Sequence, residues 1–435
     1  MGFQTGLSGL NASSKNLDVI GHNVANSATV GFKASTAQFA DVFAASLSGG
    51  GASQVGIGTK LSNVAQQFTQ GNISATNNPL DIAINGRGFF RLSDAGAVSY
   101  TRNGQFQLDK DNYIVTSSGL RLTGYQADAS GTISGALGDI QLSTADISPT
   151  ISGKVSIAAN FDSRMSVPTL TPFPTNLGTP PGTPPYSAPL PDTYNSSTSL
   201  SIYDSLGNAH TATFYFVKQA AAGEWKAYMT VDNGVNTAGA VTELTTAANG
   251  GNLTFDTSGA LTGPGAPAGT ITLPTIPWDA AMNLGIALTQ PLDFNFAGTT
   301  QYGSAFGVST LSQDGFTSGR MAGFSIGVDG TVKGRYTNGQ TQTLGQVALA
   351  NFANPQGLQQ MGDNQWAESA SSGAAMVGAP GTASLGVLQS SSTEDSNVDL
   401  TAELVNMIVA QRAYQANAQT IKTQDAIQQT LMNLR

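Results

Sequence analysis

The chain of 435 residues contains no cysteine. Disulfide bonds, thiolate metal sites and cysteine nucleophiles are therefore excluded together. Charged residues make up only 10% of the chain, against roughly 25% in an ordinary soluble domain, so Ser, Thr, Asn, Gln and Gly must supply most of the surface. The formal net charge of −9 argues against nucleic acid as a partner, because nucleic acid binding requires a basic face.

Long hydrophobic runs and a secretory signal are also missing. No run of about 18 apolar residues occurs, so we expect no insertion into a membrane. The first residues contain no basic stretch followed by an apolar stretch. We therefore expect that export, if it occurs, does not use a cleavable signal peptide.

The residues that usually carry catalysis are scarce. The chain has two histidines, His22 and His210, and neither has a second histidine or a cysteine at ligand spacing. There is no G-x-S-x-G elbow and no phosphate-binding G-x-x-x-x-G-K-[ST] motif. The sequence therefore predicts no cofactor, no metal and no enzyme activity. Two carboxylates that meet only in the fold are the catalytic arrangement that the pattern leaves open.

The two ends of the chain share a helical pattern that the middle lacks. Apolar residues near both ends recur in alternating steps of four and three, which is typical of a coiled-coil seam. The predicted seam residues are Phe3, Leu7, Leu10, Leu17, Val24, Leu400, Leu404, Met407, Tyr414, Ile421 and Leu431. An ordinary amphipathic helix on a globular core would explain either segment alone, but the matching pair favours assembly. Ser396 or Asn397 is the expected N-cap of the second helix, with Asp399 in its first turn.

The sequence between the two helices has the signals of β-structure. Alternating apolar runs are separated by the turn dipeptides Asn103-Gly104, Asp329-Gly330 and Asn338-Gly339. We therefore expect a multidomain, mainly β chain with terminal helices that pair as a coiled coil. The expected parts are a helical domain at 1–30 and 393–435, a connector at 31–70, a split inner β domain with a C-terminal connector at 71–152 and 316–392, and an inserted outer β domain at 153–315. A proline-rich stretch at 168–191 predicts an extended loop.

The motifs at the two termini resemble those of bacterial flagellar rod and hook proteins. The run ANSATVGFK contains Ala25, Asn26, Thr29, Gly31, Phe32 and Lys33 at the positions of that family's ANxxTxGFK signature. The run from Ser396 to the C-terminus is similar to the family's closing helix. NGRGFFRL and YTRNGQFQLDKDNYIV look like the inner domain that rod and hook proteins share. YDSLGNAHTATFYFVK and LGQVALANFANPQGLQQMGDNQWAES look more like hook members.

The resemblance implies a structural subunit that self-assembles into the flagellar hook, a flexible tube that transmits torque from rod to filament. It implies an extracellular location and export through the flagellar type III apparatus. The implied partners are further copies of the chain, the distal rod protein, the hook–filament junction protein, the hook cap or scaffold protein and the export apparatus. Phe39 and Phe43 resemble the F-x-x-x-hydrophobic motif of early export substrates, although a plain hydrophobic contact explains their spacing equally well.

Other functions remain as alternatives at this point. A distal rod or junction protein of the same family would share the termini, but a distal rod protein is shorter and junction proteins lack this middle. A cell-surface adhesin or pilus-like fibre would share the Gly/Thr-rich β composition, but it would not need matched terminal helices. A secreted polysaccharide-active enzyme would need clustered aromatics, whereas the 8% of aromatic residues here are scattered.

Overall fold

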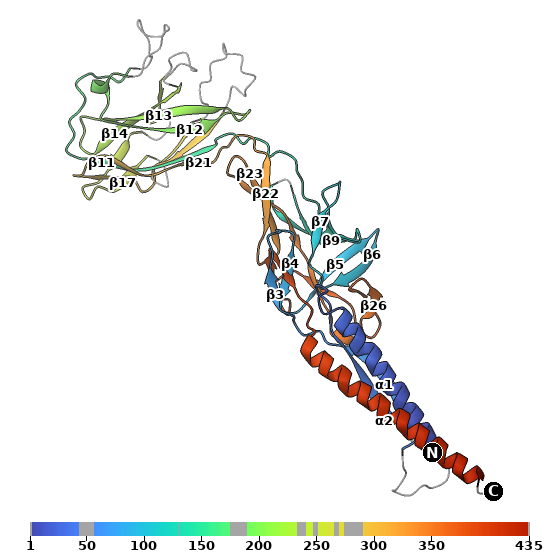
Figure 1. Cartoon of the computed structure of the whole chain (residues 1–435). Coiled ribbons are helices and arrows are strands. Elements are labelled where there is room, and N and C mark those ends of the chain that lie inside the picture. The colour runs from blue at the N-terminus through green and yellow to red at the C-terminus, as the bar shows by residue number, and fades with distance from the viewer. Residues whose placement is uncertain are drawn as a thin grey trace. The chain divides into compact units, whose positions relative to one another are not determined.

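The structure of the chain is a computed structural model (Figure 1). It describes residues 2–42, 56–128, 130–174, 189–232, 241–246, 251–264, 269–273 and 290–433. The chain forms two compact units. Unit 1 comprises 1–144, 322–335 and 341–435, and unit 2 comprises 145–321 and 336–340. Unit 2 is therefore an insert in unit 1, and it is longer at both ends than the insert expected from the sequence.

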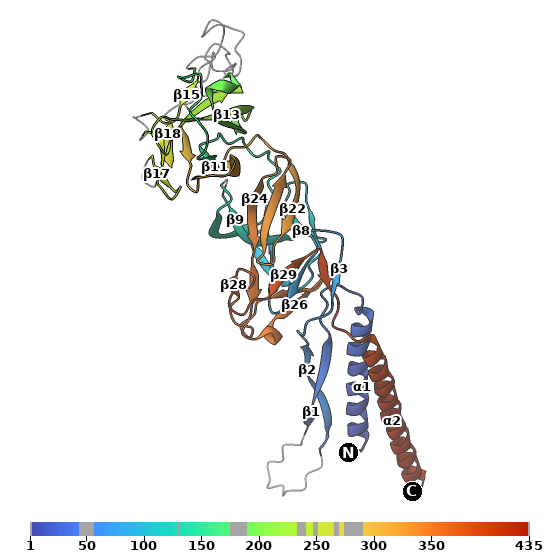
Figure 2. The ribbon, with the colours of Figure 1, turned by 90° about the vertical axis from the view of Figure 1, so that its left-hand side faces the viewer.

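Unit 1 begins and ends with helices, α1 (Gly2–Ala25) and α2 (Leu400–Asn433). Neither segment contains proline, so no backbone N–H donor is missing from the helical ladder. The two helices pack against each other with opposite chain directions, and their free ends lie together (Figure 2). The mainly β fold with packed terminal helices, predicted from the sequence, is confirmed.

The N-cap of α2 differs from the one expected. Asp399 accepts hydrogen bonds at its Oδ1 from the backbone N–H groups of Thr401, at 2.9 Å, and Ala402, at 3.1 Å. These N–H groups lie in the first turn, where no carbonyl of the helix can reach them. Asp399 is therefore the cap, whereas Ser396 and Asn397 precede it.

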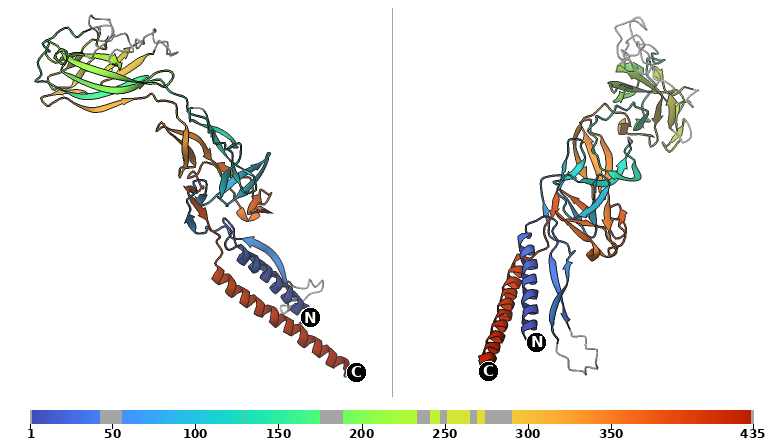
Figure 3. Two further views of the ribbon diagram at one scale, coloured as in Figure 1. Left: turned by 45° about the horizontal axis from the view of Figure 1, so that its top comes forward. Right: turned by 90° about the vertical axis from the view of Figure 1, so that its right-hand side faces the viewer.

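A β-hairpin follows α1 in the segment that the sequence predicted only as a connector. Its strands, β1 (Ser35–Val42) and β2 (Gly58–Gln66), pair antiparallel with a register shift between Gln38 and Phe39. The hairpin lies along α1, which separates it from α2 (Figure 3). The glycines at 49–51, within the connector expected at 31–70, lie outside the described residues.

The β part of unit 1 contains one large sheet of 13 strands and two sheets of two strands each. The large sheet comprises β5 (Phe89–Asp94), β6 (Ala97–Thr101), β7 (Phe106–Leu108), β8 (Ile114–Thr116), β9 (Arg121–Ala127), β10 (Ile133–Asp139), β22 (Met321–Ile326), β23 (Thr331–Tyr336), β24 (Thr341–Val347), β25 (Leu349–Asn351), β26 (Gln359–Gly362), β27 (Gln365–Ala367) and β28 (Met376–Gly378). The small sheets pair β4 (Ile82–Asn85) with β29 (Val387–Ser390) and β3 (Ile73–Ala75) with β30 (Ser392–Glu394). A short 3₁₀ turn, η5 (Pro355–Gly357), precedes β26.

These sheets enclose an apolar core that draws on both halves of the split domain. Ile82, Phe90 and Leu92 from the first half pack with Val332 and Val347 from the second half, and all five are buried. Strands β22, β23 and β24 are consecutive neighbours in the sheet, as the turn dipeptides at 329–330 and 338–339 predicted. The core therefore depends on segments that lie on either side of the insert in the sequence.

Unit 2 is a sandwich of two sheets around one core. One sheet comprises β11 (Lys154–Asp162), β18 (Thr270–Leu273), β19 (Leu292–Asn295), β20 (Thr300–Tyr302) and β21 (Gly307–Gln313). The other comprises β12 (Ser196–Tyr203), β13 (Ala209–Lys218), β14 (Glu224–Val231), β15 (Thr242–Glu243), β16 (Leu253–Phe255) and β17 (Leu261–Gly263), and the 3₁₀ turn η1 (Pro191–Thr193) precedes β12. Phe161 from the first sheet stacks on Trp225 from the second at 4.8 Å between ring centroids. Most of the proline-rich stretch lies outside the described residues.

Candidate assembly site

The sequence motif after α1 begins with a turn that ends the helix. Ala25 is the last helical residue, and Asn26 donates a hydrogen bond from Nδ2 to the backbone oxygen of His22 at 2.9 Å. Thr29 then donates from Oγ1 to Oδ1 of Asn26 at 3.3 Å. Short polar side chains of this kind bond to nearby backbone and compete with further helix. The motif therefore fixes the point at which the chain leaves α1.

Gly31 allows this turn to lie close to the β domain. Its φ is +72°, and a Cβ there would lie 2.6 Å from the backbone nitrogen of Asn103. Its N–H donates to the backbone oxygen of Glu394 at 2.8 Å. The adjacent Phe32 is buried, and its ring packs edge-on against His22 at 5.4 Å between centroids. Only glycine combines this backbone conformation with so close an approach.

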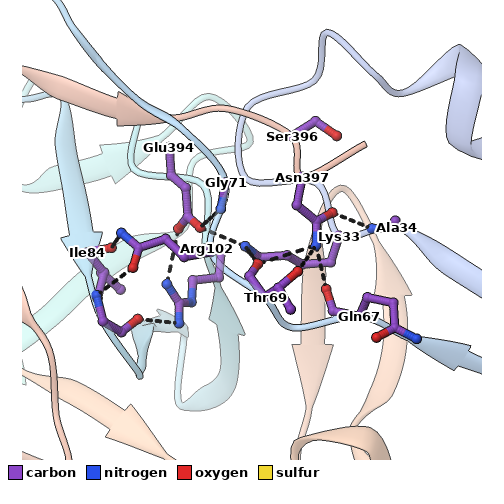
Figure 4. Close-up of polar contacts among 12 residues, drawn as sticks. Lys33, Ala34, Gln67, Thr69, Gly71, Ile84, Arg102, Glu394, Ser396 and Asn397 are labelled. Atoms are coloured by element: carbon purple, nitrogen blue, oxygen red, sulfur yellow. Dashed lines mark hydrogen bonds and ion pairs between the residues drawn. The ribbon is translucent and has the colours of Figure 1, made fainter. Parts of the chain in front are cut away.

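Lys33, the last residue of the motif, belongs to a buried cluster of three charged side chains (Figure 4). Lys33 places its Nζ 2.6 Å from Oε1 of Glu394, and Arg102 places its Nη1 3.1 Å from Oε2 of the same carboxylate. The three side chains are 0%, 4% and 0% exposed for Lys33, Arg102 and Glu394. Lys33 also donates to the backbone oxygen of Thr69 at 2.8 Å. The cluster joins the segment after α1, the segment after β6 and the segment before α2.

The carboxylate of Glu394 balances two cations that water does not reach. Burial lowers the pKa of Lys33 and the pKa of Arg102, and in both cases the Glu394 carboxylate opposes that shift. Arg102 makes a further hydrogen bond from Nη2 to the backbone oxygen of Gly86 at 2.9 Å, and its guanidinium lies over the Phe89 ring. Its Nε has no hydrogen-bond partner among the described residues. Loss of Glu394 would therefore leave two buried charges unpaired, which is costly.

Two asparagines attach the ends of both helices to the hairpin. Asn23 exchanges two hydrogen bonds with the backbone of Ser35, at 2.8 and 2.9 Å. Asn397 accepts from the N–H of Ala34 at 2.8 Å and donates to the backbone oxygen of Gln67 at 2.7 Å (Figure 4). An amide side chain can bond both to a donor and to an acceptor of a strand edge. The helix ends are thereby held to the hairpin by hydrogen bonds.

Two glycines of α1 lie close to α2. A Cβ at Gly9 would lie 2.7 Å from Oδ1 of Asn417, and a Cβ at Gly6 would lie 3.1 Å from Cγ1 of Ile421. Ala410 is the buried position of α2 within this contact. Glycines at these positions let the two backbones approach closely. Besides the predicted seam residue Ile421, the contact includes Gly6, Gly9 and Asn417, which the sequence did not predict.

Within the chain, the predicted seam residues differ in exposure, and one of them, Ile421, lies against Gly6 of α1. Phe3, Leu7, Leu400, Leu404 and Tyr414 are exposed. Leu10, Leu17, Val24, Met407 and Ile421 are half-buried, and the side chain of Leu431 lies outside the described part. Their role in assembly stays a prediction.

Sequence reasoning missed other residues of the site. Val405, Ile408 and Val409 are exposed on α2 beside the predicted seam. The heptad spacing selected Leu404 and Met407 and left these three residues out. The run LVNMIVA is nevertheless apolar on more than one face of the helix. Arg102 and Glu394 were also missed, because no local spacing connects residues so far apart in the sequence.

Of the two residues suggested for export, one lies in a described strand. Phe39 is an exposed residue of β1, and Phe43 lies outside the described residues. No helix in the part of the chain that the structure describes is long and apolar enough to cross a membrane. Nor do the described residues bring together three or more His, Cys, Asp or Glu side chains that could hold a metal ion.

Four family models match the chain in order along its length. The model described as "Flagella basal body rod protein" matches 3–33, and "Flagellar hook protein FlgE/F/G D1 domain" matches 83–160. "Flagellar basal body protein FlaE D2 domain" matches 160–316, and "Flagellar basal body rod FlgEFG protein C-terminal" matches 389–434. The first and last of these matches cover the motif after α1 and the whole of α2.

Curated relatives match over the full chain. The flagellar hook protein FlgE of Escherichia coli K12 is 43% identical over 100% of both chains. That of Borreliella burgdorferi is 31% identical over 99% of this chain and 98% of its own. Among solved structures, the Helicobacter pylori hook protein FlgE2 matches with a TM-score of 0.49 at 13% identity, over 73% of this chain and 99% of that one. The full-length relatives show that the chain belongs to the flagellar hook protein FlgE family, whose members are structural subunits of the flagellar hook.

Proposed function

We propose that copies of this chain self-assemble through α1 and α2 into the wall of a tube, the flexible joint that transmits torque from the rod to the filament. The observation that carries the proposal is the apolar surface of α2. Leu404, Val405 and Ile408 are 45%, 56% and 51% exposed in the single chain. Burying one such side chain contributes roughly 1.5–3 kcal/mol, and a polymer repeats that gain at every subunit.

The buried charge cluster supports the transmission of torque. Lys33, Arg102 and Glu394 connect the base of both helices to the β domain of unit 1 through short, desolvated contacts. Asn23 and Asn397 add backbone hydrogen bonds at the same level. A force applied to a helix is thereby passed to the β domain through several bonds that must break together.

The composition of the chain supports bending. Only 10% of the residues are charged, so contacts between neighbouring β domains would consist mainly of neutral hydrogen bonds. Each such bond contributes about 0.5–1.5 kcal/mol net. Exchanging one for another during a small displacement changes the energy little, whereas ion pairs would favour one register.

The proposed partners follow from the family. They are other copies of the chain, the distal rod protein at one end, the junction protein at the other, the hook cap protein during growth, and the type III export apparatus. We propose export without a cleavable signal and an extracellular location, with Phe39 and Phe43 as the export motif. The proposed role is structural, without catalysis and without a cofactor.

Polymerisation of the purified full-length chain tests the proposal, with the variant Leu404→Ala as the probe. The variant should lose polymer formation in sedimentation and electron microscopy, because each interface loses part of its apolar surface. Its circular dichroism should keep the β signal of the monomer. Leu206→Ala is the matched control, because Leu206 is 54% exposed in unit 2 and lies outside the helices. Normal polymerisation of Leu404→Ala, or loss of its β signal, would contradict the proposal.

A further inference from the structure

A groove runs along the helix pair on the side of the hairpin. It is formed by α1, α2, β1 and β2, and it encloses about 590 Å³. Its walls are apolar at Val19, Ile20 and Phe39 and otherwise consist mainly of small or amide side chains. Glu403 is the one charged residue among those that line it.

The carboxylate of Glu403 lacks a partner in the single chain. Its Oε2 is shielded from solvent and accepts no hydrogen bond from any described residue. No Lys, Arg or His lines the groove beside it. A carboxylate oxygen without water or a donor is unfavourable, and a cation that enters the groove would relieve this. Among the described residues, the groove therefore lacks a hydrogen-bond donor or a cation for the Glu403 carboxylate.

The opposite face of α2 carries a matching group. Arg412 is exposed and has no ion-pair or hydrogen-bond partner among the described residues. It follows Glu403 by two and a half helical turns, so the two side chains leave the helix in opposite directions. The exposed Val405 and Ile408 lie on the face of Arg412. This face therefore carries the cation Arg412 beside apolar residues, and the groove carries the anion Glu403 beside apolar residues.

Other cations of the helices fit the groove less well. Lys15 already pairs with Asp18 at 3.2 Å. Lys422 lies about five turns beyond Glu403 along α2 and is not on the opposite face. A planar guanidinium also bonds a carboxylate at two points, which an ammonium group does not do. Arg412 is therefore the group that best complements the groove.

We infer that Arg412 of one copy enters the groove of the next copy and pairs with its Glu403. The inference rests on the proposed self-assembly and adds the residues that set its register. Because the anion and the cation lie on opposite faces of one helix, the contact joins different surfaces of the two copies and is head-to-tail. Heterologous contacts generate an open helical polymer when the rotation from copy to copy does not close a ring. The pair therefore specifies how α2 of one subunit is placed beside the helix pair of its neighbour.

Charge exchange between copies provides the first test. Glu403→Arg alone should repel Arg412 of its neighbour, and Arg412→Glu alone should repel Glu403, so each should polymerise at least about tenfold less than the unaltered chain. An equimolar mixture of the two variants should polymerise. In it, residue 403 of one variant and residue 412 of the other carry opposite charges. The chain that carries both changes should also polymerise. Lys422→Glu is the control and should polymerise normally.

Circular dichroism and thermal unfolding of each monomer show whether a variant folds. Glu403→Gln keeps the shape of the side chain, and it should fold and yet polymerise less than the unaltered chain. If the two charge-reversed monomers fold but neither their mixture nor the double variant polymerises, the pairing is wrong. Normal polymerisation of Glu403→Gln would overturn it as well.

Disulfide trapping gives a second, independent test, since the chain contains no cysteine. Glu403→Cys and Arg412→Cys in one chain cannot bond within that chain, because about 13 Å of helix rise separates them and a disulfide needs Cα atoms within about 7 Å. Oxidation of the polymer should give a ladder of linked subunits on a denaturing gel. Glu403→Cys with Lys422→Cys should give none. Absence of the ladder in polymer of the first pair would overturn the pairing, whereas failure of the unaltered chain to polymerise would overturn the proposed function itself.

Discussion

The helix pair and unit 2 bury their apolar residues in opposite ways. In unit 2, residues from both sheets, among them Phe161, Phe214 and Trp225, form one core that solvent does not reach. In α2, by contrast, Ala410 is the buried apolar residue among those described, and larger residues such as Val405 and Ile408 are exposed. Unit 2 buries its large apolar residues within one chain, whereas the helix pair leaves several of them exposed.

The difference teaches where the stability of each region comes from. The sandwich gains its free energy within the chain, as ordinary domains do. At their base the helices are held by buried charges and by asparagine hydrogen bonds to the hairpin, and glycines of α1 lie close to Asn417 and Ile421 of α2. Most of their apolar surface remains to be buried by other copies. Changes in the two regions should therefore affect different measurements.

The largest expected effect on stability comes from Trp225→Ala in unit 2. Trp225 is fully buried and stacks on Phe161, so its truncation should lower the free energy of unfolding of unit 2 by about 4 kcal/mol. Hydrogen exchange of the full chain should show lost protection in β13 and β14, with unit 1 unchanged. Leu404→Ala should change monomer stability by no more than about 0.5 kcal/mol. If Trp225→Ala and Leu404→Ala lowered the stability of the monomer equally, the contrast between unit 2 and the helices would be wrong.

Glu394→Gln should be the next most damaging change, and it acts on unit 1. It leaves Lys33 and Arg102 buried without a counter-charge, which should cost about 3 kcal/mol of unit 1 stability. Denaturant unfolding followed by the fluorescence of Trp366, in unit 1, would measure the loss. Asp18→Asn removes the exposed pair with Lys15 and serves as a control that should have almost no effect. An unfolding midpoint equal to that of the control would show that the cluster does not hold the helix base.

Gly31→Ala should have a smaller effect at the same place. Its left-handed backbone and the nearby nitrogen of Asn103 should together make alanine cost about 2 kcal/mol. Gly21 provides the matched control, because nothing lies within 4 Å of a Cβ built there. Gly21→Ala should stabilise α1 by up to about 1 kcal/mol. Thermal unfolding of both variants measures the contrast, and equal shifts would contradict the role assigned to the turn.

The sequence predicted elements whose signals are local. The heptad spacing indicated both helices, and the dipeptides at 329–330 and 338–339 indicated the turns of β22–β24. The close approach of the two helices at Gly6, Gly9 and Asn417 was not predicted, because these residues carry no apolar signal. The partnership of Lys33 and Glu394 was not predicted either, since the two residues meet only after the β domain has folded.

The smallest effect that we predict is a pH dependence of unit 2. Arg164 donates hydrogen bonds to the carboxylate of Asp162 and lowers its pKa to about 2. Because this pKa lies below the ordinary value of 3.8, the stabilisation is complete above that value and is lost as the pH falls from it towards 2. The pair is exposed on the arginine side, so salt should weaken the effect. An NMR titration of the Asp162 carboxyl carbon should show the low pKa, and Arg164→Gln should move it upwards. A titration of Asp162 that Arg164→Gln leaves unchanged would show that the pair contributes nothing to the acid stability of the sandwich.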